Sequence, residues 1–275
     1  SITPLSQDFI DHISEYSNEE IAFEVIKQFI GDEIPAEKLK EIIKKTISFE
    51  FPVVTIEKNI GSLELYHGPT MAFKDVGARF MSQCLEYFNQ DNKEDITVLV
   101  ATSGDTGGAV ANGFLNAKGV QVVILYPSGK VSDIQEKQLT TLGNNITALE
   151  VDGVFDDCQE MVKSAFLDQE ISRKLTSANS INVARWLPQM FYFFFAYKQV
   201  SAQHKDIVLS TSKKLERKLF FRYVLLDIIA GTGAYTALHM VRKLYVEPER
   251  FGTAVPLKFD QTFLLAAAAT TALFI

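Results

Sequence analysis

Three apolar runs between residues 96 and 152 alternate with segments of helical pattern, and this alternation constrains the fold more than any other feature. The runs are ITVLVAT (96–102), VQVVILYP (120–127) and ITALEVD (146–152), and helical patterns follow them at 105–116, 134–142 and 158–171. Such alternation is typical of parallel strands joined by right-handed crossovers. The pattern therefore predicts an α/β protein, whose ligands would bind at the carboxyl ends of the strands.

The rest of the chain predicts further helices and short strands. Helices are expected where apolar residues recur at helical spacing, at 5–30, and in a charged segment behind Pro35, at 36–46. Short strands are expected at 51–56, 63–66 and 207–210. The aromatic run MFYFFFAYKQ (190–199) is expected to pack in a core.

Composition narrows the function classes. The chain has 275 residues, 47% of them hydrophobic, and a formal net charge of -7. A nucleic acid or an anionic membrane would require a basic surface, so neither partner is expected. The two cysteines, Cys84 and Cys158, predict no disulfide framework and favour a reducing, cytoplasmic location. The start shows no signal-peptide pattern, the apolar run at 263–275 is too short to span a bilayer, and no metal-ligand spacing is present.

A turn rich in small residues, ATSGDTGGA (101–109), lies between a predicted strand and a predicted helix. Its exposed N–H groups and the helix dipole favour a bound phosphate or carboxylate, and Thr102, Ser103 and Thr106 add hydroxyl donors. The alternative is an ordinary tight turn in which Asp105 or Thr106 caps the helix. The spacing fits neither a Walker loop nor a dinucleotide fingerprint.

A second segment, HGPTMAFKDVGARF (67–80), places Lys74 between a turn and a helix. A lysine that bonds covalently to an aldehyde cofactor must be held rigidly and partly desolvated, so that its amine is neutral enough to attack. A helix N-terminus also disfavours an ammonium ion. The alternative is a surface lysine in the first helical turn that pairs with Asp75.

A third segment, SANSINVARWLPQ (177–189), combines short polar side chains with a cation. Asn179, Ser180 and Asn182 can donate hydrogen bonds, and the guanidinium of Arg185 can bind an oxyanion through two of them. The alternative is a capped turn with Arg185 in a surface ion pair.

Taken together and in this order, the three segments resemble those of the threonine synthases, pyridoxal-phosphate (PLP) enzymes of the tryptophan-synthase-β-like family (fold type II). The resemblance covers about residues 50–205. It implies a two-lobed, three-layer αβα fold with PLP in the cleft between the lobes. It also implies a small-molecule substrate, since the family converts O-phospho-L-homoserine and water to L-threonine and phosphate.

The resemblance implies a role for each matching position. Lys74 matches the lysine that carries PLP and later moves protons at the substrate, Phe73 matches the residue beside the cofactor ring, and Asp105 matches the position next to its 3′-oxygen. The remaining matches are to the substrate-receiving loop (Thr102, Ser103, Thr106) and to the pocket for the substrate phosphate (Asn179, Ser180, Arg185).

The sequence departs from the family after Ser210. The family carries a Gly/Asn-rich loop there that binds the PLP phosphate, whereas this chain reads TSKKLERK. We therefore expect a sequence with intervening parts missing, and we place neither the phosphate loop nor the partner of the ring nitrogen. The expected division is an N-terminal segment that includes Lys74 (1–85), a small lobe with the anion-binding loop (86–188) and an incomplete remainder of the large lobe (189–275).

Two other functions stay open at this point. One is another fold type II lyase, such as a serine or threonine dehydratase, although Arg185 with Asn179 and Ser180 favours a phosphorylated substrate. The other is a threonine-synthase-like binding protein that has lost catalysis, which the missing phosphate loop supports. The sequence makes no prediction of oligomeric state.

Overall fold

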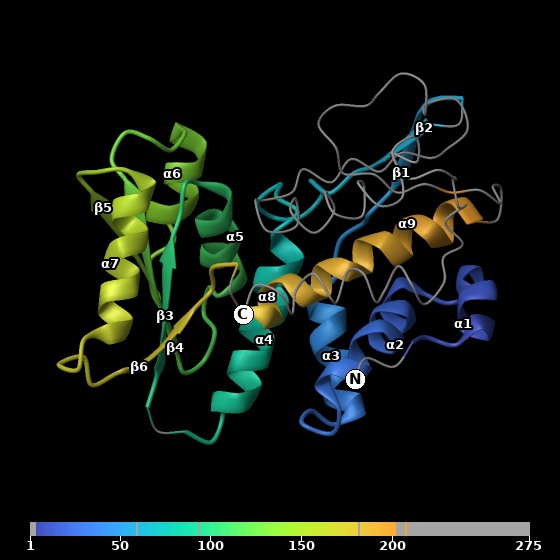
Figure 1. Cartoon of the computed structure of the whole chain (residues 1–275), viewed down its shortest axis with the longest axis horizontal. Helices are drawn as coiled ribbons and strands as arrows, with labels where there is room; N and C mark the ends of the chain where they lie inside the picture. Colours follow the sequence, from blue (N-terminus) through green and yellow to red (C-terminus); the bar gives the residue numbers. More distant parts are fainter. Residues whose placement is uncertain (1–3, 59, 93, 181, 202–206, 208–275) are drawn as a thin grey trace, which may run out of the picture. The chain divides into compact units, whose positions relative to one another are not determined.

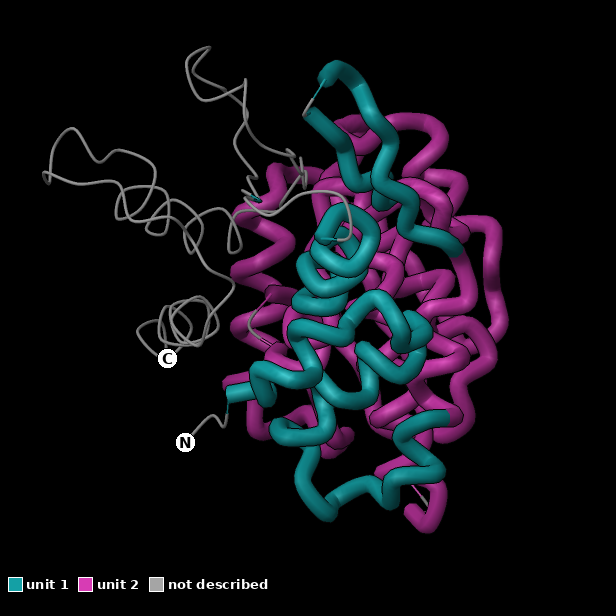
Figure 2. Tube along the Cα trace, turned by 90° about the vertical axis from the view of Figure 1, so that its right-hand side faces the viewer, with its two compact units in different colours: residues 1–40, 50–65, 190–275 teal, residues 41–49, 66–189 magenta. Residues whose placement is uncertain are grey.

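The computed structural model describes residues 4–58, 60–92, 94–180, 182–201 and 207. The chain divides into two compact units, coloured in Figure 2, and neither is one continuous stretch of sequence. One contains residues 1–40 and 50–65 and the chain from 190 onward, and the other contains residues 41–49 and 66–189. The division expected after residues 85 and 188 stays a prediction. Lys74 and the anion-binding loop belong to the same compact unit.

A four-stranded parallel sheet forms the centre of the second unit, in the order β5-β4-β3-β6. Its strands are β3 (Ile96–Ala101), β4 (Val120–Pro127), β5 (Ile146–Val151) and β6 (Lys174–Ser177). Ile96 pairs with Val120 on one side and with Lys174 on the other. The α/β prediction is confirmed, but the short strand β6 was not predicted, because KLTS has no apolar run.

Helices cover both faces of this sheet, which makes the unit three layers thick (Figure 1). The helices on one face are α4 (Asp75–Asn89), α5 (Asp105–Gly113) and α6 (Asp133–Thr140), and α7 (Phe155–Leu167) lies on the other. The helix expected at 158–171 is thus shifted toward the N-terminus. Asp157 starts it early by accepting a hydrogen bond from the N–H of Val154, and Asp168 ends it by accepting one from the N–H of Glu170.

Two glycines let helices approach α4 closely. A Cβ at Gly77 would overlap the carbonyl oxygen of Arg185 in the short helix α8 (Val183–Trp186), which continues as η2 (Leu187–Met190). A Cβ at Gly113 of α5 would lie 3.1 Å from Ala78. Helix α4 is therefore packed tightly against both α5 and α8. This packing gathers the residue before α4, the start of α5 and the side chains of α8 in one neighbourhood.

The first unit is built from helices and one antiparallel hairpin. Its elements are α1 (Gln7–Asp11), η1 (Ile13–Glu15), α2 (Asn18–Ile30), β1 (Val53–Glu57), β2 (Ile60–Leu63) and α9 (Phe191–Ser201), and α3 (Ala36–Thr46) has residues in both units. The helical pattern at 5–30 is interrupted, because Ser17 and Glu20 form a capping box that starts α2. The strand expected at 63–66 lies instead at 60–63.

The aromatic run on α9 is core, as predicted. Phe191, Tyr192, Phe194 and Phe195 are buried, and the ring of Phe51 lies 5.3 Å from that of Phe195. Helix α3 also matches its predicted bounds. The strand expected at 207–210, the departure after Ser210 and the run at 263–275 lie outside the described residues, apart from Ile207.

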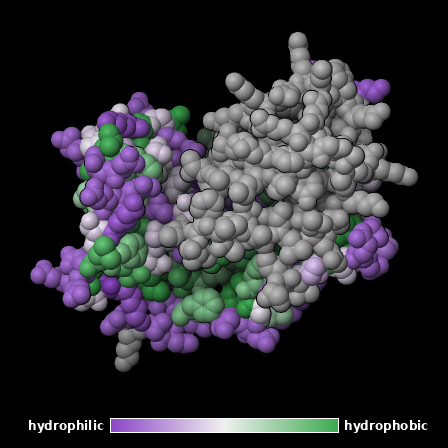
Figure 3. All heavy atoms as spheres, viewed as in Figure 1, coloured by the Kyte–Doolittle hydropathy of each residue, from purple (hydrophilic) through white to green (hydrophobic). Residues whose placement is uncertain are grey.

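The surface in view over the sheet-containing unit is mostly hydrophilic with interspersed hydrophobic residues (Figure 3). No helix among the described residues has the length and apolar character needed to cross a bilayer. Cys84 and Cys158 are both buried and free. Within the same residues, no cluster of three or more His, Cys, Asp or Glu side chains could hold a metal ion.

Candidate functional site

The loop before α4 is fixed by the carboxylate of Asp75. Thr70 donates to Asp75 through its N–H (3.0 Å) and its hydroxyl (2.5 Å), and burial raises the pKa of that carboxyl while these bonds oppose the rise. A Cβ at Gly68 would overlap the same carboxylate, and Met71 adopts a left-handed conformation with φ 56°. Asp75 thus fixes the loop that leads to Lys74 by accepting hydrogen bonds from Thr70. The alternative of a Lys74–Asp75 ion pair is therefore wrong.

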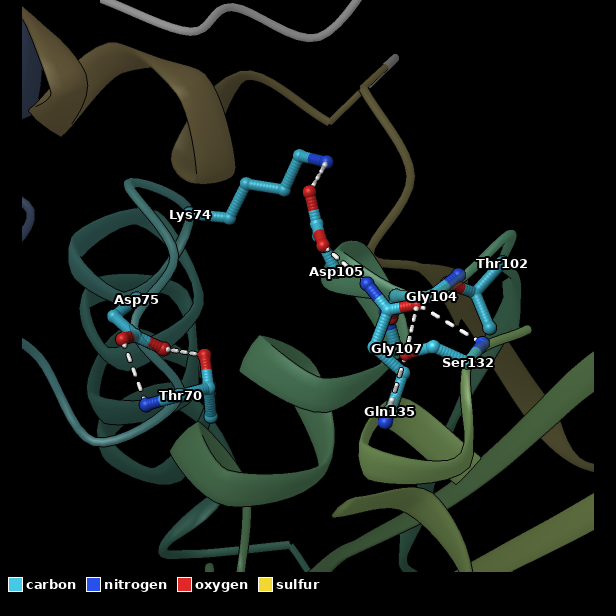
Figure 4. Close-up of polar contacts among 9 residues, drawn as sticks. All are labelled: Thr70, Lys74, Asp75, Thr102, Gly104, Asp105, Gly107, Ser132 and Gln135. Atoms are coloured by element: carbon cyan, nitrogen blue, oxygen red, sulfur yellow. Dashed lines mark hydrogen bonds and ion pairs between the residues drawn. The ribbon is translucent and has the colours of Figure 1, made fainter. Parts of the chain in front are cut away.

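Lys74 instead faces the start of α5 (Figure 4). Its Nζ lies 3.6 Å from Oδ2 of Asp105 and 5.4 Å from the ring centre of Phe73, and its side chain is only 14% exposed. Burial lowers the pKa of the Lys74 amine, the charge of Asp105 opposes that fall, and the charge of Arg185 adds to it. The structure therefore brings Lys74, Asp105 and Arg185 within electrostatic range of one another.

The turn between β3 and α5 is organised by the hydroxyl of Thr102. Its oxygen accepts hydrogen bonds from the N–H groups of Gly104 (3.0 Å) and Gly107 (2.8 Å), and the residue is buried. The cap residue is Gly104, at φ 137°, so the alternative with Asp105 or Thr106 in that position is wrong. Within the described residues, the N–H groups of Asp105 and Thr106 have no acceptor, which leaves two donors at a helix N-terminus for an anion.

Replacing Thr102 by valine is expected to destabilise this unit by about 1–3 kcal/mol, because two buried N–H groups lose their acceptor. Thr97 offers a matched control, since it lies on β3, the strand that leads to Thr102, is also buried, and has a hydroxyl without a hydrogen-bond partner among the described residues. Thr97→Val should leave the free energy of unfolding unchanged or slightly raised. Urea denaturation of both variants measures the difference, and equal stabilities would contradict the assigned role of Thr102.

The side-chain amides of the asparagines in the third segment form hydrogen bonds with backbone groups. Asn179 donates to the carbonyl of Ala101 (2.9 Å) and accepts from its N–H (3.2 Å), which continues the pairing of β3 beyond the end of β6. Asn182 caps α8 by accepting from the N–H of Ala184 (3.0 Å). The capped-turn alternative is therefore right for this stretch. Ser180 is exposed, as is Ser103 in the other loop, and Thr106 is half-buried.

Arg185 is buried, with 5% of its surface exposed, so the alternative of a surface ion pair is wrong. One Nη donates to the carbonyl of Ala178 (2.9 Å), and Nε has no hydrogen-bond partner among the described residues. Burial lowers the pKa of the guanidinium to about 10, so it remains charged at neutral pH. No described carboxylate forms a salt bridge with it. A buried cation without a counter-charge is costly, and a bound anion would offset that cost.

Sequence reasoning missed Gln135, which donates to Oδ1 of Asp105 at 2.5 Å. A signal was available, because Ser132 and Gln135 have the spacing of a capping box and form one at the start of α6. The contact with Asp105, 30 residues away, had no such signal. Together, the described residues offer a desolvated amine, a carboxylate beside it, N–H donors without an acceptor and a buried guanidinium without a counter-charge. This set suits covalent capture of a carbonyl group next to an anion.

Two family models match the chain. The model described as "Pyridoxal-phosphate dependent enzyme" matches residues 62–211, more than half of the sequence. The model described as "Threonine synthase N terminus" matches residues 1–47. The first match contains Lys74 and the segments around Asp105 and Arg185.

Curated relatives and solved structures agree with these models. Threonine synthase of Buchnera aphidicola (subspecies Baizongia pistaciae) is 51% identical over 190 residues, which cover 68% of this chain and 44% of the relative. That of Escherichia coli is 49% identical over 184 residues, 66% of this chain and 42% of the relative. This chain thus spans less than half the length of these relatives.

The crystal structure of threonine synthase from Escherichia coli matches with a TM-score of 0.70 and 45% identity, over 76% of this chain and 49% of that one. The crystal structure of threonine synthase from yeast also has a TM-score of 0.70, at 39% identity, over 76% of this chain and 46% of that one. By the family model that covers most of its length, and by these relatives, the chain belongs to the family of pyridoxal-phosphate dependent enzymes.

Proposed function

We propose that the protein is a threonine synthase, which converts O-phospho-L-homoserine and water to L-threonine and phosphate with PLP on Lys74. The observation that carries this proposal is the buried guanidinium of Arg185, which forms no salt bridge with a described carboxylate and lies within electrostatic range of the Lys74 amine. A cofactor lysine alone would suit many PLP enzymes. A desolvated cation beside it selects a substrate that brings an additional anion, such as a phosphate ester.

The residues around Lys74 fit the cofactor. Burial lowers the pKa of the amine, so a larger fraction is neutral and able to bond to the aldehyde carbon of PLP. In this proposal, Phe73 would supply an apolar surface for the ring, and Asp105 would lie next to the ring oxygen. PLP, when bound, supplies an electron sink that stabilises negative charge at substrate carbons. The residues that would bind the PLP phosphate and the ring nitrogen lie outside this set.

In this proposal, the chain's own groups move protons and hold anions. The Lys74 amine takes protons from Cα and Cβ of the substrate and returns protons to Cγ and Cα. Arg185, with Asn179 and Ser180 of the same segment, stabilises the phosphate as the bond between Cγ and its oxygen breaks. Thr102 keeps the turn in shape, and the open N–H groups with Ser103 and Thr106 receive the substrate. Water then adds at Cβ, which completes the balance of threonine and phosphate.

The remaining proposals follow from the reaction class. The substrate is a small molecule, and neither nucleic acid nor membrane is a partner. A cytoplasmic location is proposed from the two free cysteines and from the reducing compartment that they favour.

Turnover of three substrates by the purified, PLP-supplemented protein tests the proposal. O-Phospho-L-homoserine should release phosphate and form threonine, with kcat/KM roughly 100-fold or more above that for L-serine or L-threonine, because those lack the phosphate that Arg185 would pair with. Turnover of L-serine and L-threonine alone would identify a dehydratase instead. A protein that stays colourless after addition of PLP would indicate a binding module without catalysis.

A further inference from the structure

The side chain of Gln135 connects the start of α6 to the start of α5 (Figure 4). Its Oε1 accepts from the hydroxyl (3.1 Å) and the N–H (3.4 Å) of Ser132, and its Nε2 donates to Oδ1 of Asp105. A carboxylate can only accept, and the Ser132 N–H can only donate. The amide can therefore satisfy both neighbours in one orientation alone, with nitrogen toward Asp105.

Gly104 makes this contact possible. It adopts φ 137° at the N-cap of α5, and a Cβ there would overlap the amide group of Gln135. Gln135 thus fills the space that a side chain at position 104 would take. Its amide is held by α6 on one side and lies against the backbone of the anion-binding turn on the other.

Asp105 needs such a partner because its own surroundings do not fix it. Its side chain is 52% exposed, and an exposed aspartate samples several rotamers. Here its two oxygens are divided, Oδ1 toward Gln135 and Oδ2 toward Lys74. We propose that Gln135 is a positioning residue, which holds Asp105 in the orientation from which its second oxygen faces the Lys74 amine. This inference rests on the proposed role of Lys74 as the cofactor lysine.

The orientation of Asp105 has a direct effect on Lys74. Among the described residues, two charged groups act on the amine, Asp105 from α5 and Arg185 from α8, while Asp75 is turned toward Thr70. Burial and Arg185 both lower the pKa of Lys74, and Asp105 is the one described residue that opposes them. An Asp105 that rotates into solvent would therefore leave the amine with a lower pKa, and a smaller fraction of it would be protonated.

Competitive acetylation of the cofactor-free protein across pH, read by mass spectrometry of the Lys74 peptide, tests this directly. Asp105→Asn should lower the pH midpoint of Lys74 labelling by about one pH unit, since it removes the opposing charge. Gln135→Leu should lower it in the same direction by a smaller amount. Gln138→Leu is the matched control, because Gln138 lies on the same helix but faces Gly108. It should leave the midpoint unchanged.

The double variant Asp105→Asn/Gln135→Leu separates positioning from a general loosening of the site. If Gln135 acts on Lys74 through the Asp105 carboxylate, the double variant should have the same midpoint as Asp105→Asn alone. A further fall on adding Gln135→Leu would indicate loosening that does not act through Asp105 and would overturn the inference, as would a Gln135→Leu midpoint equal to the native one. The measurement requires neither PLP nor substrate, so its failure is distinguishable from a failure of the proposed activity.

Discussion

Replacing Lys74 by alanine is expected to abolish covalent retention of PLP and to reduce turnover of O-phospho-L-homoserine by at least about 10³-fold. The amine is proposed both to hold the cofactor and to move the protons, and loss of positioned proton transfer alone costs about 10²–10⁴-fold. The fold should not suffer, because the replacement removes an ammonium that burial disfavours. Borohydride treatment followed by peptide mass spectrometry should find PLP on the Lys74 peptide of the native protein only.

Lys137→Ala is the matched control for this variant, since Lys137 is an exposed lysine of the same unit. It should retain the absorbance, the borohydride-fixed mass and the turnover of the native protein. Cofactor fixed on another lysine in the native protein would contradict the assignment of Lys74.

Replacing Arg185 by methionine is expected to weaken binding of the phosphorylated substrate by roughly 30- to 4,000-fold. That range corresponds to the cost of about 2–5 kcal/mol for removing one partner of a buried charge pair. The free energy of unfolding should stay the same or rise, because a buried cation without a described counter-charge is lost. Arg185→Lys should not restore affinity, since an ammonium lacks the planar fork of donors. Substrate saturation curves and urea denaturation measure the two effects.

Arg79 is the matched control, because its replacement should affect stability and not substrate affinity. Its guanidinium donates to the carbonyl of Lys45 and to the hydroxyl of Ser48 (2.9 Å), contacts that tie α4 to the end of α3 and the residues after it. Arg79→Met should therefore lower stability while it leaves the affinity for substrate near the native value. If the two arginine variants lose affinity equally, Arg185 has no special role toward the phosphate.

The parallel sheet was predictable because three of its strands are apolar runs that alternate along the chain with segments of helical pattern. Strands β3, β4 and β5 lie within one residue of their expected bounds. Strand β6 was not readable, since its four residues are stabilised by pairing with β3 rather than by local propensity. The break before α2 could have been read from Ser17 and Glu20, whose capping-box spacing is local.

Within the candidate site, residue types were easier to predict than their contacts. Lys74, Asp105 and Arg185 do come together, but their grouping depends on the packing of α4, α5 and α8, which no local pattern encodes. Thr102 and Asn179 have hydroxyl and amide groups that suit a ligand, yet both are engaged with backbone, Asn179 across 78 residues of sequence. The cofactor- and substrate-binding roles expected for all these residues, and for Phe73, Ser103, Thr106 and Ser180, stay predictions.

The missing side chain at Gly77 sets a length as well as a packing contact. Gly77 lies three residues beyond Lys74 on α4, and its backbone meets the carbonyl of Arg185. Any larger residue would push α8 outward and carry the guanidinium away from the amine. Under the proposed function, the absence of a side chain at Gly77 therefore sets the distance between the two groups that would bind one substrate, the Lys74 amine and the Arg185 guanidinium. A larger residue at position 77 would then be expected to favour substrates in which the two binding groups are further apart.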